Sequence, residues 1–146
     1  IASDSESPDF VFKRTYRRVN QAYEDRFGWP LFLPLTEQDT YNFETLRVPV
    51  NNSIAEMDML VLSLVKILID SLNEKNIENC DEHIKFLRNL QELRSSGTGH
   101  RKGKGYQKIT KTLDVKNENY AETFSNLLNG ATDFIIFMDA NSVKLV

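Results

Sequence analysis

The chain has few features that would identify its function directly. A single cysteine, Cys80, among 146 residues excludes an internal disulfide. Acidic residues flank Cys80, so we expect an unreactive thiol, consistent with a reducing compartment. No stretch approaches the roughly 18 apolar residues of a membrane span, and no signal-peptide pattern is present. These absences predict no membrane partner and a cytoplasmic location.

The usual signatures of nucleotide and metal sites are also missing. The sequence contains no phosphate loop, no GxGxxG, no CxxC and no zinc-type spacing of histidines and cysteines. His83 and His100 are the two histidines, and no other histidine or cysteine lies four residues after His83. The carboxylates are scattered, which argues against a paired acid–base site. We therefore predict no cofactor and no bound metal.

Length and composition fit one globular domain. With 40% hydrophobic and 27% charged residues, the chain can bury a substantial core. Residues 1–8 are polar, acidic and without periodicity, so we expect a flexible linker or the cut end of a longer protein there. Residues 9–146 are expected to form a single domain.

Apolar residues recur at helical spacing through most of the chain. No strand-like alternation competes with this pattern, so we predict an all-α fold, an up-down helical bundle of four main helices plus short ones. The main helices are expected over about 9–27, 54–72, 81–94 and from Asn117 or Asn119 onward, and the short ones over about 36–47 and 106–113.

The connection from Trp29 to Leu35 is too apolar for an ordinary loop, and its two prolines forbid a helix. We predict an extended strap across the bundle, with an aromatic ligand pocket on Trp29 as the less favoured alternative. The helix after Ser53 begins with a capping box, Ser53 and Glu56, and is the most apolar segment. Its wide apolar surface predicts a central helix that also has surface for a dimer interface.

The first predicted helix carries a cluster of positive charge. Lys13, Arg14, Arg17 and Arg18 lie off its apolar stripe. We favour a solvated face paired with acidic residues of the same helix over a phosphate-binding surface.

Positive charge is most concentrated between Arg94 and Lys111. This stretch holds six lysines and arginines and no carboxylate. Since the whole chain carries −3 and this stretch +6, the remainder carries −9. Such segregation predicts a local anionic partner.

Arg94 and His100 stand out within this basic stretch. Arg94 follows Leu87 and Leu90 at helical spacing, which places its side chain near the buried edge of the helix, and His100 comes six residues later. A histidine that titrates near neutral pH, beside arginines that bind phosphate, supplies the groups needed for metal-free RNA cleavage. The alternative is a basic cap loop that only binds or packs.

The segment LRNLQELRSSGTGHRKGKGYQKI, with Arg94 ending a helix and His100 just beyond, resembles the Arg-x(4–6)-His motif of the HEPN superfamily. Many HEPN domains are metal-independent endoribonucleases of toxin, antiphage and CRISPR-associated systems, and they dimerise to form a composite site. The resemblance implies that Arg94 stabilises the phosphate, that His100 is the general acid or base, and that Ser95 takes the motif's polar position.

The leading hypothesis is thus a HEPN-like homodimer that binds RNA, with Arg94 and His100 as its catalytic residues. The expected RNA contacts are Ser95, Arg101, Lys102, Lys104, Lys108 and Lys111.

Two other hypotheses remain. In a non-catalytic dimerisation or assembly domain of a larger defence or regulatory protein, Arg94 would pair with a buried acid such as Asp70 or Glu56. A small-nucleotide-binding domain would require a concave pocket near Trp29 or Tyr106.

Overall fold

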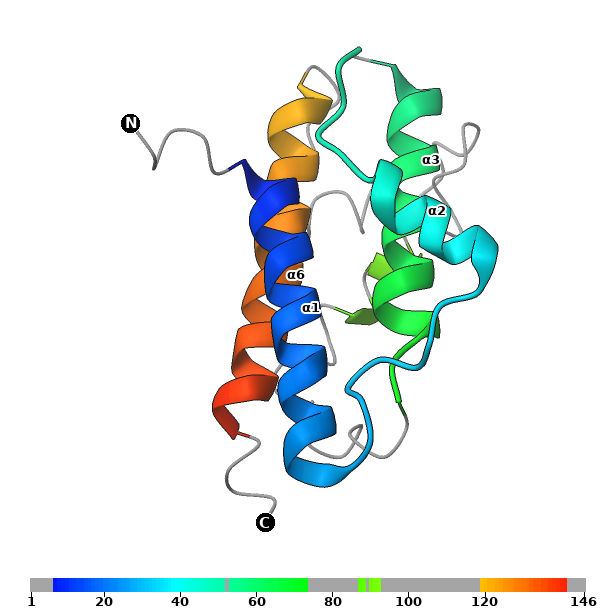
Figure 1. The fold of residues 1–146 in the computed structure, drawn as a ribbon. Helices are drawn as coiled ribbons and strands as arrows, with labels where there is room; N and C mark the ends of the chain where they lie inside the picture. The colour runs from blue at the N-terminus through cyan, green and yellow to red at the C-terminus, as the bar shows by residue number, and fades with distance from the viewer. Residues whose placement is uncertain (1–6, 52, 74–86, 89, 93–118, 142–146) are drawn as a thin grey trace.

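The computed structural model describes residues 7–51, 53–73, 87–88, 90–92 and 119–141. This part of the chain is mostly helical and contains no strand beyond one isolated bridge, which confirms the predicted all-α class. The elements in chain order are α1 (Pro8–Phe27), α2 (Glu37–Thr45), α3 (Ile54–Val65), the π-helical turn η2 (Lys66–Asp70) and α6 (Tyr120–Asn141) (Figure 1).

Local sequence signals set both ends of α1. Pro8 is in the first turn, where its missing amide hydrogen costs nothing, so the helix starts one residue earlier than we expected. Gly28 ends the helix with φ at 82°, and its amide donates to the Glu24 carbonyl at 3.0 Å. Glycine adopts this left-handed conformation without steric cost, which explains the stop at the predicted residue.

The predicted strap is confirmed. Leu31 and Phe32 are fully buried, and Phe32 forms a bridge with Leu72 at the end of the third helix. The Leu33 amide donates to the Ser71 carbonyl at 2.6 Å, and the Asn73 amide donates to the Leu31 carbonyl at 2.9 Å. The strap therefore fastens the C-terminal end of α1 to that of η2.

The short helix α2 follows directly. Its N-cap is Thr36, whose hydroxyl accepts from the Asp39 amide at 3.1 Å, as the sequence predicted. The helix ends at Thr45, two residues before the expected end, because Leu46 turns to extended backbone and buries its side chain in the core.

The central apolar helix differs from the expected single rod over 54–72. Ser53 caps it as predicted, but regular α-helix ends at Val65 and continues as η2. The Ser71 hydroxyl donates to the Lys66 carbonyl at 2.9 Å, and Leu72 leaves the helix to pair with Phe32. Pairing with a segment some forty residues away in sequence is invisible to periodicity, so the end of this helix was mispredicted.

The last helix matches its prediction closely. Asn119 is the cap, since its side-chain oxygen accepts from the Glu122 amide at 3.0 Å. All members of the predicted packing stripe are buried: Tyr120, Phe124, Leu127, Ala131, Phe134 and Met138.

Helices α1 and α6 pack side by side and run in the same direction (Figure 1). Near their C-terminal ends, the Tyr23 hydroxyl donates to the Met138 carbonyl at 2.8 Å, and Arg26 pairs with Asp139 at 3.2 Å. The expected strict up-down order is not confirmed by this pair. The two helices can run in the same direction because the strap and α2 carry the chain back along the molecule before α3 begins.

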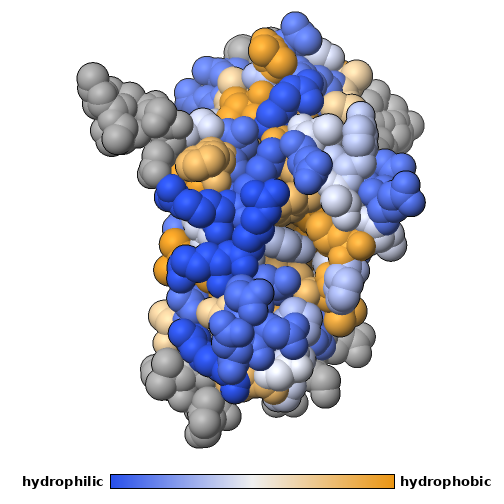
Figure 2. All heavy atoms as spheres, viewed as in Figure 1, coloured by the Kyte–Doolittle hydropathy of each residue, from blue (hydrophilic) through white to orange (hydrophobic). Residues whose placement is uncertain are grey.

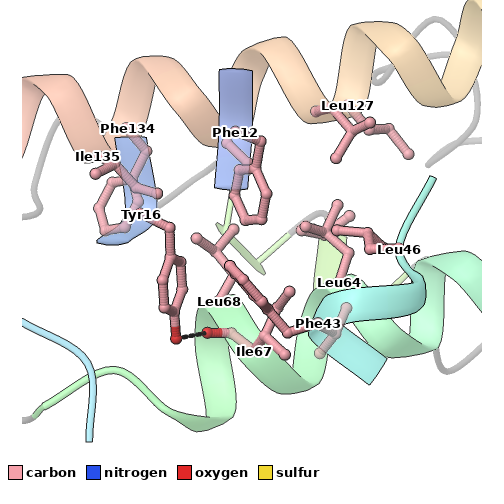
Figure 3. Close-up of a cluster of buried hydrophobic side chains, with 14 of the residues drawn as sticks. Phe12, Tyr16, Phe43, Leu46, Leu64, Ile67, Leu68, Leu127, Phe134 and Ile135 are labelled. Carbon is pink, nitrogen blue, oxygen red and sulfur yellow. Dashed lines mark hydrogen bonds between the residues drawn. The ribbon is translucent and has the colours of Figure 1, made fainter. Parts of the chain in front are cut away.

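The core lies between the α1–α6 pair and the α3–η2 helix. Figure 3 shows Phe12, Tyr16, Phe134 and Ile135 meeting the side chains of α3 and η2. Because the apolar residues of α1, most of them aromatic, face this core, charged residues occupy the outer side of the helix.

Candidate functional site

The predicted catalytic pair and the predicted RNA contacts lie outside the described residues. This applies to Arg94, Ser95, His100, Arg101, Lys102, Lys104, Lys108 and Lys111. Their roles stay predictions. The structure describes part of the helix that leads to them, where Leu87 and Leu90 are buried and Arg88 is exposed. The apolar stripe from which the position of Arg94 was predicted is therefore present at these two positions.

The basic residues of α1 divide into two groups. Arg18 and Arg26 both pair with Asp139 of α6, at 3.3 Å and 3.2 Å. We expected acidic residues of α1 to pair with Arg18, and that expectation was wrong, because the carboxylate comes from a helix more than a hundred residues later in the sequence.

The second group consists of Lys13, Arg14 and Arg17. The Lys13 ammonium donates to the Glu44 carbonyl at the end of α2, with 3.0 Å between the two atoms. Burial, and to a lesser degree the charge of Arg17, lowers the pKa of Lys13, although Asp9 and Glu44 oppose the shift. Figure 2 shows the resulting hydrophilic band along α1.

A groove of about 470 Å³ opens beside this band, between α1, the strap and α2. Its apolar walls come from the strap and from the aromatic residues Tyr16 and Phe43. Its polar rim comes from Arg17, Asn20, Gln21, Glu24, Thr40 and Glu44. Such a volume lies in the range of ordinary ligand sites.

One side of the groove is a stacked pair. The Arg17 guanidinium lies over the Phe43 ring, with 4.9 Å from its central carbon to the ring centroid. Within the described part of the chain, Arg17 makes this ring contact and no ion pair. Arg17 is exposed and makes no hydrogen bond to the described residues, so its N–H donors are available. A cation fixed over an aromatic ring is suited to bind a planar or anionic group.

Two amide side chains on the rim have defined orientations. The Asn20 side-chain oxygen accepts from the Phe32 amide at 2.7 Å, which leaves its NH₂ group as a donor. The Gln21 NH₂ group donates to Asp25 at 3.0 Å, which leaves the Gln21 oxygen as an acceptor. The rim therefore offers a fixed donor and a fixed acceptor on consecutive residues of α1.

The third hypothesis requires a pocket near Trp29 or Tyr106; Tyr106 lies outside the described residues, and sequence reasoning did not predict this groove. Trp29 does not line it, because its ring stacks on Phe27 at a centroid distance of 5.3 Å. In the sequence, the available indication of such a groove was the apolar strap that follows a helix rich in arginine. That signal could not reveal that Phe43 of α2 would lie beneath Arg17.

Glu56 is a buried carboxylate outside the groove. It accepts from the Arg47 guanidinium and from the amides of Val50 and Asn51, the latter at 2.8 Å. Burial alone would raise its pKa, but the amides of Asn51 and Val50 together with Arg47 lower it. Both carboxylate oxygens of Glu56 thus accept hydrogen bonds from the loop that precedes α3. Glu56 therefore has a structural role, because it holds this loop against the helix.

Comparisons with known proteins identify no relative: no protein-family model, no curated protein and no solved structure matches this chain. Among the described residues, no group of three or more histidines, cysteines or carboxylates is placed to hold a metal ion. In the described ranges, no helix is both long enough and apolar enough to cross a membrane. Functional inference therefore depends on the chain's own residues.

Proposed function

We propose that this chain is a HEPN-like RNA-binding domain and a metal-independent endoribonuclease of a bacterial toxin or antiphage defence system. The observation that carries the proposal is the segregation of charge: +6 between Arg94 and Lys111 in a chain of net −3, placed directly after an amphipathic helix. The burial of Leu87 and Leu90 supports the helix on which the position of Arg94 depends. Phosphate contacts of lysine and arginine are the main source of RNA affinity.

In the proposed reaction, the RNA 2′-oxygen attacks the adjacent phosphorus and the bond to the 5′-oxygen breaks. The products are a 2′,3′-cyclic phosphate and a 5′-hydroxyl. His100 of one copy removes the 2′-hydroxyl proton, and His100 of a second copy protonates the leaving oxygen. Arg94 stabilises the additional negative charge on the phosphorane through its fixed N–H donors.

The two-copy site requires a dimer, and α3 offers a surface that supports one. Ala55, Met59 and Leu62 follow each other at helical spacing on its exposed side, and Met59 and Leu62 are 49% and 39% exposed. Apolar residues grouped on one helix face are typical of contact surfaces. This observation also favours the second candidate function, a non-catalytic assembly domain of a larger defence or regulatory protein.

Cleavage of labelled single-stranded RNA in EDTA tests the catalytic proposal. We expect the parent to cleave and both Arg94→Ala and His100→Ala to lose at least about a hundredfold in rate, the usual contribution of a charge-stabilising donor and of an acid–base group, respectively. The matched controls Arg88→Ala and His83→Ala should cleave like the parent.

Circular dichroism and thermal unfolding would verify that the inactive variants are folded. Intact RNA after incubation with the folded parent would overturn catalysis. The assembly function would then be tested by light scattering, where a dimer in the parent and a monomer in a Met59→Lys, Leu62→Lys variant are expected.

A further inference from the structure

The groove beside α1 has the chemistry of a nucleobase site. Bases of single-stranded RNA are commonly recognised by stacking on aromatic rings or guanidinium planes, and by hydrogen bonds to their edges. The exposed Arg17 guanidinium over Phe43 provides such a plane, and the apolar wall formed by Leu33, Pro34 and Leu35 faces the same space.

Charge on the rim distinguishes a base from a phosphate as the occupant. Glu24 and Glu44 line the groove and would repel a phosphate placed inside it. The same carboxylates can accept hydrogen bonds from the amino groups of a base. The Asn20 donor and the Gln21 acceptor are complementary to a base edge, which presents both donors and acceptors.

Phosphates would follow the positive band outside the groove. Phe10, Arg14 and Arg17 lie at i, i+4 and i+7, which places them on one face of α1. Phe10 is 52% exposed, and the Arg14 guanidinium lies 5.3 Å from its ring centroid. Two cations therefore lie here against aromatic rings, Arg14 on Phe10 and Arg17 on Phe43 of α2, and surfaces that bind single-stranded nucleic acid combine the same two groups.

We propose that the groove between α1, the strap and α2 binds one base of a single-stranded RNA, stacked against Arg17. The neighbouring phosphates contact Lys13 and Arg14. This inference depends on the proposed RNA binding and adds to it a second contact surface, separate in sequence from Arg94–Lys111. It makes α1 a substrate-positioning surface with no part in bond cleavage.

The test is fluorescence anisotropy with a labelled single-stranded RNA, comparing the parent with Arg17→Lys. Lysine keeps the charge but lacks the planar group, so we expect affinity to fall about tenfold, in line with the loss of one stacked base. Arg26→Lys is the matched control, because Arg26 lies on the same helix and pairs with Asp139, and it should bind like the parent. Arg17 is exposed, so its variant should fold normally.

A double variant, Arg101→Gln with Lys102→Gln, separates this inference from the proposed function. If the double variant loses affinity while Arg17→Lys binds like the parent, the groove site is overturned and RNA binding by the basic stretch is retained. If the parent does not bind RNA, both proposals are overturned. Weaker binding by Arg17→Lys, with Arg26→Lys unchanged, supports the base site.

Discussion

The hydroxyl of Tyr16 on α1 donates a hydrogen bond of 2.9 Å to the main-chain carbonyl of Ile67 on η2 (Figure 3). The Tyr16 ring also stacks on Phe32 of the strap, with 4.2 Å between centroids and 6° between planes. One side chain therefore joins the first helix, the strap and the irregular end of the central helix. Burial, with a smaller contribution from Asp39, raises the pKa of the Tyr16 hydroxyl above its ordinary value, as expected for a buried hydroxyl that stays protonated.

Tyr16→Phe should lower the free energy of unfolding by about 1–3 kcal/mol, because the Ile67 carbonyl loses its donor inside the core. Urea denaturation followed by circular dichroism measures this difference. Tyr41→Phe is the control, since Tyr41 is 63% exposed and its change should be small. Equal stability of both variants would show that the Tyr16 hydroxyl contributes nothing to the fold.

Adjacent isoleucines on α6 provide a matched test of the core. Ile135 is fully buried and Ile136 is 46% exposed. Ile135→Ala should cost about 2–5 kcal/mol, because it leaves a cavity between the helices. Ile136→Ala should cost far less in the same denaturation experiment. A reversed order would contradict the packing of α6.

Glu56 should make stability depend on pH in the acidic range. Its folded pKa is lowered from 4.5, so the stabilisation is present above that value and is lost as the pH falls through the folded pKa. We expect Glu56→Gln to be less stable than the parent at pH 7, and the difference to narrow below about pH 4.5. Denaturation of both proteins at several pH values measures this difference in stability.

Glu24→Gln, on the exposed side of α1, is the control for the Glu56 experiment and should follow the parent at every pH. A difference between parent and Glu56→Gln that stays constant from pH 7 to pH 3 would contradict the role of ionised Glu56.

Local signals predicted the helices well where the decisive contacts are close in sequence. Gly28, Thr36, Ser53 and Asn119 end or begin helices as expected, because a cap bonds to amides or carbonyls within a few residues.

The errors came from contacts between distant segments. The bridge from Leu72 to Phe32 shortened the central helix, and Arg18 pairs with Asp139 of α6 where we expected an acidic residue of α1. The groove was missed for the same reason, since it forms where Arg17 of α1 contacts Phe43 of α2. The candidate catalytic residues were predicted from helical spacing, local charge and a short motif, and they lie outside the described part of the chain.

The most direct test of the central claim is the salt dependence of RNA binding. Anisotropy titrations over a range of salt concentrations should show that affinity falls as salt rises, with a log–log slope of about −0.7 for each phosphate contact. Arg101→Gln with Lys102→Gln should weaken binding and make the slope shallower by about 1.4. The control is a second double variant, Lys75→Gln with Arg88→Gln. It removes the same amount of charge elsewhere and should change neither the affinity nor the slope. Absence of binding at low salt, or equal affinities and slopes for the two double variants, would contradict RNA recognition by the basic stretch.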